Sequence, residues 1–181
     1  MGCVITAGIA APACGARFSS PGIDRTKLWV FNYDEIAAFT SSVTGEVDAI
    51  TLDSLKVGFK LDVHKNSAMF TEELQSGEES APFYNQSLTA RIIATDTATM
   101  TAIEDMVDVD LVIVYKGRNG KFRLAGEHGG VKLTENTYES GKIAGDAVGD
   151  TLVFTGQANG KARFFFDTSE AASEVTLDSY L

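Results

Sequence analysis

The chain has 181 residues, of which 44% are hydrophobic and 22% are charged, a length and balance that fit one folded domain with a sizeable core. No apolar run approaches the roughly 18 residues that cross a bilayer, so we expect no membrane partner. A formal net charge of −10 repels polyphosphate unless basic residues cluster. The densest basic stretch, residues 116–123, is short and straddles a turn, so we also expect no direct nucleic-acid binding.

Residues 1–26 are expected to form an irregular, extended arm, because they contain Pro12, Pro21 and several glycines. The start fits a myristoylation pattern with Cys3 beside it, and the apolar stretch that follows is similar to a signal peptide. However, the first basic residue is Arg17, so the basic leader of a signal peptide is missing. We therefore expect the arm to be retained without a lipid, in a protein made in the cytoplasm.

The only two cysteines, Cys3 and Cys14, both lie in this arm. A reducing cytoplasm argues against a disulfide between them. Two thiols without nearby histidines also make a poor zinc site. Both cysteines are expected to act as buried, small apolar residues.

The first half of the chain predicts strands by its alternating and β-branched or aromatic residues. In chain order they are expected at residues 27–33, 47–52, 57–63, 67–75 and 83–93. Residues 67–75 are predicted to be the antiparallel partner of residues 57–63, across a hairpin tip at residues 64–66. In the third strand one face is formed by Val57, Phe59, Leu61 and Val63.

An aromatic row marks the first of these strands, where Trp29, Phe31 and Tyr33 share one face. Burial in the core is the favoured interpretation of this row. An exposed row that binds carbohydrate is the alternative.

One amphipathic helix of about three turns is predicted after the fifth strand. Asp96 is a suitable N-cap, and Met100, Ile103, Met106 and Val107 recur at helical spacing. Glu104 and Asp105 take the other side. We expect one stripe of this helix to be buried.

The last third of the chain predicts strands and turns almost throughout. Residues 111–115 and 121–125 form a hairpin around Asn119-Gly120, because Asn-Gly supplies the positive φ angles of a tight turn. Residues 131–134 form another strand, and residues 151–157 and 162–166 a second hairpin.

These elements predict a mainly β fold, either a β-barrel or a β-sandwich of about eight strands with one flanking α-helix and extended terminal arms. Residues 1–26 would form the N-terminal arm, residues 27–167 the single β domain, and the polar residues 168–181 a C-terminal tail. We expect at least one arm to pack against a neighbouring subunit, since chain ends fray unless something holds them.

Neither histidine predicts catalysis. His64 lies at the expected hairpin tip, and His128 precedes two glycines as in an oxyanion-hole segment, but no G-x-S-x-G nucleophile elbow accompanies it. The glycine-rich stretches at residues 140–142 and 145–149 lack the spacing of a phosphate-binding loop. We expect no enzyme activity, no catalytic residue and no cofactor.

The acidic residues are interpreted as solvated charge. Neighbours such as Glu72-Glu73 in a strand point to opposite faces and cannot act on one atom, and the pairs at residues 78–79 and 104–105 are read in the same way. Asp146 and Asp150 flank glycines, but no EF-hand pattern is present, so no metal site is predicted.

Several short stretches follow one another in an order that carries a family resemblance. They are GCVITAG at residues 2–8, an aromatic strand, FYNQ at residues 83–86, one helix, an Asn-Gly hairpin, LAGEHGG at residues 124–130, and glycines from 141 to 149. From about residue 70 to residue 166 this layout resembles the tail-tube-type virion proteins of tailed phages. The resemblance lies in the order of these stretches and in their residue types, without a diagnostic motif.

The resemblance implies a β-barrel with one flanking helix that stacks as hexameric rings around a DNA channel. It also implies a virion location, production in the bacterial host, and partners that are copies of the chain and other virion proteins. Strands at residues 57–75 and 83–93 would line the ring, and both arms would lock neighbours. DNA would pass without specific binding, which suits the acidic charge. The alternatives are another virion structural protein (head-completion, connector or capsid decoration) or a carbohydrate- or ligand-binding β module.

Overall fold

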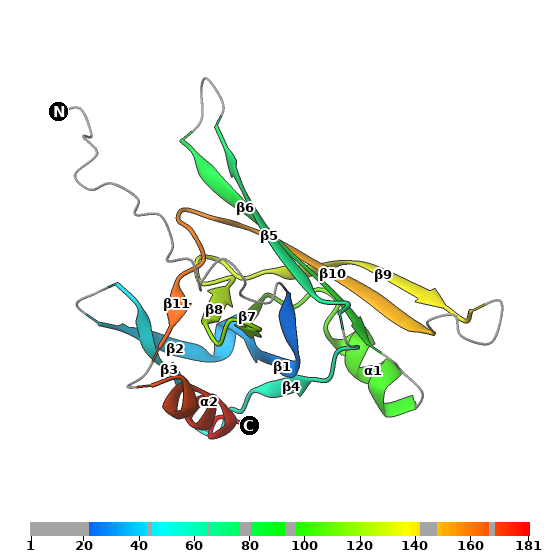
Figure 1. Cartoon of the computed structure of the whole chain (residues 1–181), viewed down its shortest axis with the longest axis horizontal. Coiled ribbons are helices and arrows are strands. Elements are labelled where there is room, and N and C mark those ends of the chain that lie inside the picture. Colours follow the sequence, from blue (N-terminus) through cyan, green and yellow to red (C-terminus); the bar gives the residue numbers. More distant parts are fainter. Residues whose placement is uncertain are drawn as a thin grey trace.

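The computed structural model describes residues 22–42, 45–64, 66–76, 81–92, 97–141, 148–166 and 169–181, and of residues 24–27 the backbone alone. This part of the chain folds into two β-sheets with two α-helices (Figure 1). The larger sheet has seven strands in the order β2 (Ile36–Ser41), β3 (Val47–Leu52), β11 (Phe164–Phe165), β8 (Phe122–Ala125), β7 (Leu111–Gly117), β1 (Ile23–Asn32) and β4 (Phe59–Leu61). A 3₁₀ turn at Tyr33–Glu35 separates β1 from β2.

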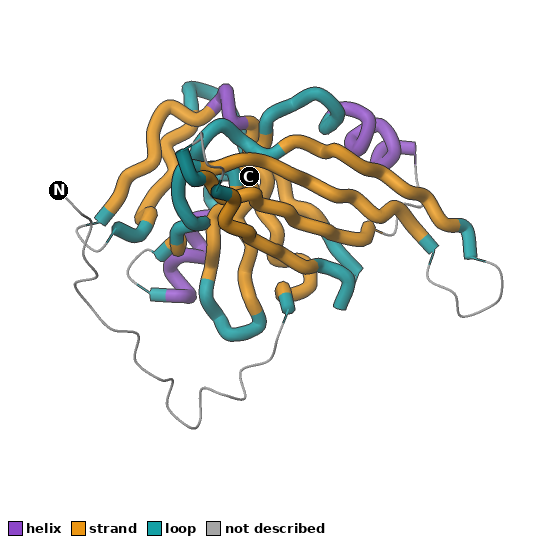
Figure 2. Tube along the Cα trace, turned by 90° about the horizontal axis from the view of Figure 1, so that it is seen from above, coloured by secondary structure: helices purple, strands orange, loops and turns teal. Residues whose placement is uncertain are grey.

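The smaller sheet has four strands, all antiparallel, in the order β5 (Met69–Gln75), β6 (Phe83–Ile92), β10 (Gly149–Ala158) and β9 (Lys132–Glu139). Figure 1 shows its ends reaching beyond the seven-stranded sheet. The helices α1 (Thr97–Asp105) and α2 (Glu170–Asp178) lie far apart (Figures 1 and 2). The mainly β prediction is confirmed.

Two hydrophobic clusters divide the molecule into layers. The first cluster joins the two sheets and α1, and includes Leu88, Phe154 and Ile103. The second lies on the other face of the seven-stranded sheet, where Leu177 of α2 packs onto it. The arrangement is sandwich-like with a helix outside the larger sheet, and the described strands form no closed barrel, since each sheet ends in two edge strands.

The central strands of the larger sheet are buried on both faces. In β7, Ile113 belongs to the first cluster while Val112 and Val114 belong to the second, and β1 alternates in the same way. A strand covered on both sides reads as a continuous apolar run, which explains why residues 111–115 are apolar throughout. The hairpin of β7 and β8 is confirmed, with Gly120 at a φ of 82° in its turn.

The predicted hairpin of residues 57–63 with residues 67–75 is wrong. β4 pairs with β1, and β5 pairs with β6, so the chain crosses from one sheet to the other between them. Of the four residues expected to share one face, Leu61 and Val63 are buried while Val57 and Phe59 are exposed. Alternation specifies two faces of a strand but not which strand lies beside it, and proximity along the chain favoured the wrong partner.

The second predicted hairpin, residues 151–157 with residues 162–166, is also wrong. β10 pairs with β6 and β9, whereas the short strand β11 pairs with β8 and lies parallel to β3. The chain therefore leaves the four-stranded sheet after Ala158 and joins the other sheet. Phe165 of β11 is buried in the second cluster. β11 therefore packs within the larger sheet and does not pair with β10.

The terminal arms differ from expectation as well. Strand β1 begins at Ile23, so the irregular N-terminal arm cannot extend to residue 26. Residues 1–21, with Cys3 and Cys14, lie outside the described residues. The expected C-terminal tail contains helix α2, for which Ser169 is the N-cap, and its hydroxyl accepts a hydrogen bond from the Ala172 N–H at 3.1 Å. This segment packs on its own domain rather than extending away from it.

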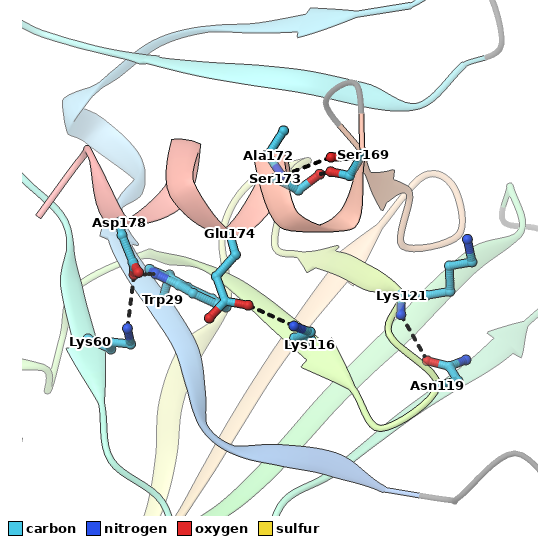
Figure 3. Close-up of polar contacts among 10 residues, drawn as sticks. All are labelled: Trp29, Lys60, Lys116, Asn119, Lys121, Ser169, Ala172, Ser173, Glu174 and Asp178. Carbon is cyan, nitrogen blue, oxygen red and sulfur yellow. Dashed lines mark hydrogen bonds and ion pairs between the residues drawn. The ribbon is translucent and has the colours of Figure 1, made fainter.

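Polar contacts hold α2 against the larger sheet (Figure 3). The indole N–H of Trp29 donates to Asp178 Oδ1 at 2.8 Å, and Lys60 reaches the same oxygen at 2.9 Å. Lys116 pairs with Glu174 at 2.7 Å. Trp29 is thus fully buried with its N–H satisfied, as a buried indole requires.

Helix α1 is present where it was predicted, but its buried stripe is narrower. Ile103 is buried and Met106 packs partly on the first cluster, whereas Met100 and Val107 are exposed. The expected N-cap, Asp96, lies outside the described residues.

Candidate assembly interface

His64 and His128 are both exposed in loops. Within the described ranges, no group of three or more His, Cys, Asp and Glu residues could hold a metal ion. Neither of the two described helices has the length and apolar character to cross a membrane.

The acidic residues are distributed differently from the expectation. Glu73, Glu104 and Asp105 are exposed, as solvated charges are, and residues 78–79 and Asp146 lie outside the described residues. Glu72 and Asp150, in contrast, are not exposed to solvent in this way. Glu72 is a structural acceptor, described next, and Asp150 is buried in a pocket.

Glu72 and Gln86 form a polar link between the two sheets that the sequence reading missed. The Gln86 side chain is buried; its amide donates to Glu72 Oε1 at 3.2 Å, and its oxygen accepts the Gly126 N–H at 3.0 Å. Glu72 Oε1 also accepts the Ala162 N–H at 2.6 Å. Gly126 follows β8 and Ala162 precedes β11, so both lie in connections that run between the two sheets. The link ties these two connections to the smaller sheet. No local pattern predicts it, because its members are far apart in sequence.

Replacing Gln86 with leucine is expected to lower the free energy of unfolding by about 1–3 kcal/mol, because it leaves the buried Gly126 N–H without its acceptor and removes one of the two donors to Glu72 Oε1. The measurement is urea denaturation. Gln157→Leu, at an exposed position of β10 in the same sheet, is the matched control and should change stability little. Equal effects of the two substitutions would contradict the role of the link.

The outer face of the four-stranded sheet is rich in hydroxyl and amide groups. Alternate residues of β6 and β10, including Leu88 and Phe154, point into the first cluster, so the residues between them face outward. Read across the sheet, the outward rows are Arg91, Thr151 and Thr137; Met69, Thr89, Val153 and Glu135; Thr71, Ser87, Thr155 and Lys132; and Glu73, Asn85 and Gln157. Both hydrophobic clusters of the described residues lie on the other side of this sheet, so neither of them covers its outer face.

The outer face carries few charged residues, and its basic residues do not outnumber its acidic residues. The acidic members are Glu73, Glu135 and Glu139, and the basic members are Arg91 and Lys132. Arg91 pairs with Glu139 at 2.9 Å, which neutralises both. A face of this composition offers a polyanion little attraction.

Both edges of the four-stranded sheet are open among the described residues. β5 pairs with β6 alone and β9 with β10 alone, and the two edge strands have seven and eight residues. Edge strands of soluble proteins are usually blunted by lysine, proline or short length. β5 contains no lysine or proline and exposes Met69 by 59% and Leu74 by 57%. Of its two glutamates, Glu72 is held in hydrogen bonds within the subunit and Glu73 is exposed. The β5 edge is therefore competent to pair with another strand.

A pocket of about 410 Å³ opens between the sheets beside the β7–β8 turn, and its lining includes Tyr115, Lys121, Arg123 and Phe164. Burial raises the pKa of the Tyr115 hydroxyl further above its usual range, so the phenol stays protonated at neutral pH. The Arg123 guanidinium lies over the Phe164 ring at 4.8 Å. The ionisable groups in this lining are two basic side chains and a phenol.

Comparisons with protein-family models, with curated proteins and with solved structures found no match for this chain.

Proposed function

We propose that the protein is a self-assembling structural subunit of a phage virion, of the tail-tube type, that stacks as hexameric rings around a DNA channel. The observation that supports this proposal best is the four-stranded sheet, which has two open edges and a polar outer face that none of the described segments covers. The subunit would be made in the bacterial host cytoplasm and act in the virion, with copies of itself and other virion proteins as partners.

The strand directions suit a ring. Because all pairs in the small sheet are antiparallel, its two edge strands, β5 and β9, run in opposite directions. If β9 of one copy lies beside β5 of the next, the contact is again antiparallel and continues the sheet. Such a head-to-tail contact closes into a ring when the rotation between copies permits it. Both open edges are satisfied in that arrangement.

The dimensions and chemistry suit a DNA channel. Six copies of a four-stranded sheet place twenty-four strands side by side, which at about 4.8 Å per strand gives a circle about 37 Å across before any strand tilt. If the larger sheet lies outside, the hydroxyl- and amide-rich face lines the lumen. Duplex DNA fits such an opening, and a lining without a basic excess lets it pass without being held.

The mass and shape of the purified full-length protein test the proposal directly. Light scattering is expected to give the mass of a hexamer or a multiple of it, and negative-stain microscopy to show rings or tubes with a central hole. A monodisperse monomer at high concentration would overturn the proposal. A protein that stays monomeric but binds assembled capsids would point to the capsid-decoration alternative.

The carbohydrate-binding alternative depended on an exposed aromatic row. Trp29 and Phe31 are fully buried, and Tyr33 packs partly on the second cluster. This row therefore offers no platform for a sugar ring.

A further inference from the structure

A second pocket lies between the end of α1 and the adjoining ends of β9 and β10. Its volume is about 640 Å³, and it is lined by Met100, Ile103, Glu104, Asn136, Tyr138, Val148 and Asp150. It lies on the inner side of the four-stranded sheet, away from the outer face on which the assembly proposal depends.

Asp150 is the unusual residue in this pocket. The whole residue is only 7% exposed and forms no side-chain hydrogen bond or ion pair with any residue in the described ranges, but its carboxylate oxygens are not fully buried, so they open into the pocket. Its position in β10 is fixed by backbone pairing with Ile92 on one side and Tyr138 on the other. A carboxylate that opens into a partly enclosed pocket attracts a cation more strongly than one on an open surface, because less water screens the charge.

Other groups in the pocket also favour a cation. Glu104 lies in the last turn of α1, where the unpaired carbonyl groups carry partial negative charge, and that turn contains no basic residue. Asn136 offers an amide oxygen. No lysine, arginine or histidine lines the pocket among the described residues. The electrostatic potential inside is therefore negative from several sources.

The remaining lining argues against a bare metal ion. Calcium takes six to eight oxygen ligands, whereas Met100, Ile103 and Val148 supply none. Met100, Val148 and the Tyr138 ring are also substantially exposed, so the pocket presents apolar surface that a ligand can cover. The matching ligand is a cation with a hydrocarbon body.

We propose that this pocket binds linear aliphatic amines, with the ammonium group on Asp150 and the alkyl chain along Met100 and Val148. A diamine would reach Glu104 with its second ammonium group and bind more tightly than a monoamine. This inference is independent of the proposed assembly, because it concerns the inner side of the small sheet.

Isothermal titration of the full-length protein with cadaverine, n-pentylamine and pentanediol tests the proposal. Cadaverine is expected to bind more tightly than pentylamine, and the uncharged diol not to bind. Asp150→Asn should weaken both amines about tenfold or more, the value of a charge-assisted hydrogen bond. Glu104→Gln should weaken cadaverine and leave pentylamine unchanged.

The matched control is Asp62→Asn, which makes the same charge change at an exposed loop position outside the pocket. If it weakens binding as much as Asp150→Asn does, the amines are attracted by the net charge alone and the proposal is wrong. Equal binding of the diol, or no binding at millimolar concentration, would also overturn it. Should Asp150→Asn fail to fold, Val148→Lys provides the second variant, since a lysine at the mouth is expected to occupy the carboxylates and abolish cadaverine binding.

Discussion

A chain that lacks residues 169–181 is expected to lose its cooperative fold. Helix α2 covers the outer face of the larger sheet, and removing it exposes Trp29 and Phe31 and takes away Leu177, all of which are fully buried. Burial of one side chain of this size contributes about 1.5–3 kcal/mol, so the truncation costs on the order of 5 kcal/mol or more. That loss is comparable with the whole stability of many domains.

Point substitutions separate the contribution of α2 from general effects of truncation. Leu177→Ala is expected to lower the free energy of unfolding by about 2–5 kcal/mol, because it opens a cavity in the second cluster. Val175→Ala, at an exposed position of the same helix, should change it by no more than about 0.5 kcal/mol. Urea denaturation followed by Trp29 fluorescence measures both. An unchanged midpoint for the truncated chain would show that α2 is not needed by its own domain.

The second large effect is expected on assembly. Introducing lysine at both exposed apolar positions of β5, as Met69→Lys with Leu74→Lys, should convert rings or tubes into monomers. A lysine on an edge strand must lose hydration when another strand pairs with it, which is how natural proteins prevent such pairing. Both side chains are more than half exposed in the single subunit, so its fold should persist. Light scattering and negative-stain microscopy measure the outcome.

The control for the edge variant is Leu55→Lys. Leu55 is 97% exposed and lies in the connection between β3 and β4, outside the four-stranded sheet, so the same chemical change there should leave assembly intact. Assembly that survives the β5 substitutions would exclude this edge from the subunit contact. Circular dichroism of each variant establishes that loss of assembly is not loss of fold.

Helix α2 had a weak sequence signal that a polar composition concealed. Ser169 is a good N-cap, two alanines follow it, and Ser173 and Leu177 stand four residues apart on the buried side. One leucine and one serine make a narrow apolar stripe, so periodicity alone favoured a tail. The helix forms because the large apolar face around Trp29 needs a cover, which is a property of the assembled sheet.

The mainly β class, the position of α1, the β7–β8 hairpin and the burial of Trp29 and Phe31 were predictable from local sequence. These features depend on local turn chemistry and on side-chain periodicity, which are properties of short segments. Long-range packing was needed to show that β4 pairs with β1, that β11 joins the larger sheet, that Glu72 and Gln86 hold connections between the sheets, and that Asp150 lies in a pocket. Each of these depends on residues distant in the chain, and a distant contact is selected by the total burial of the fold rather than by the segments that make it.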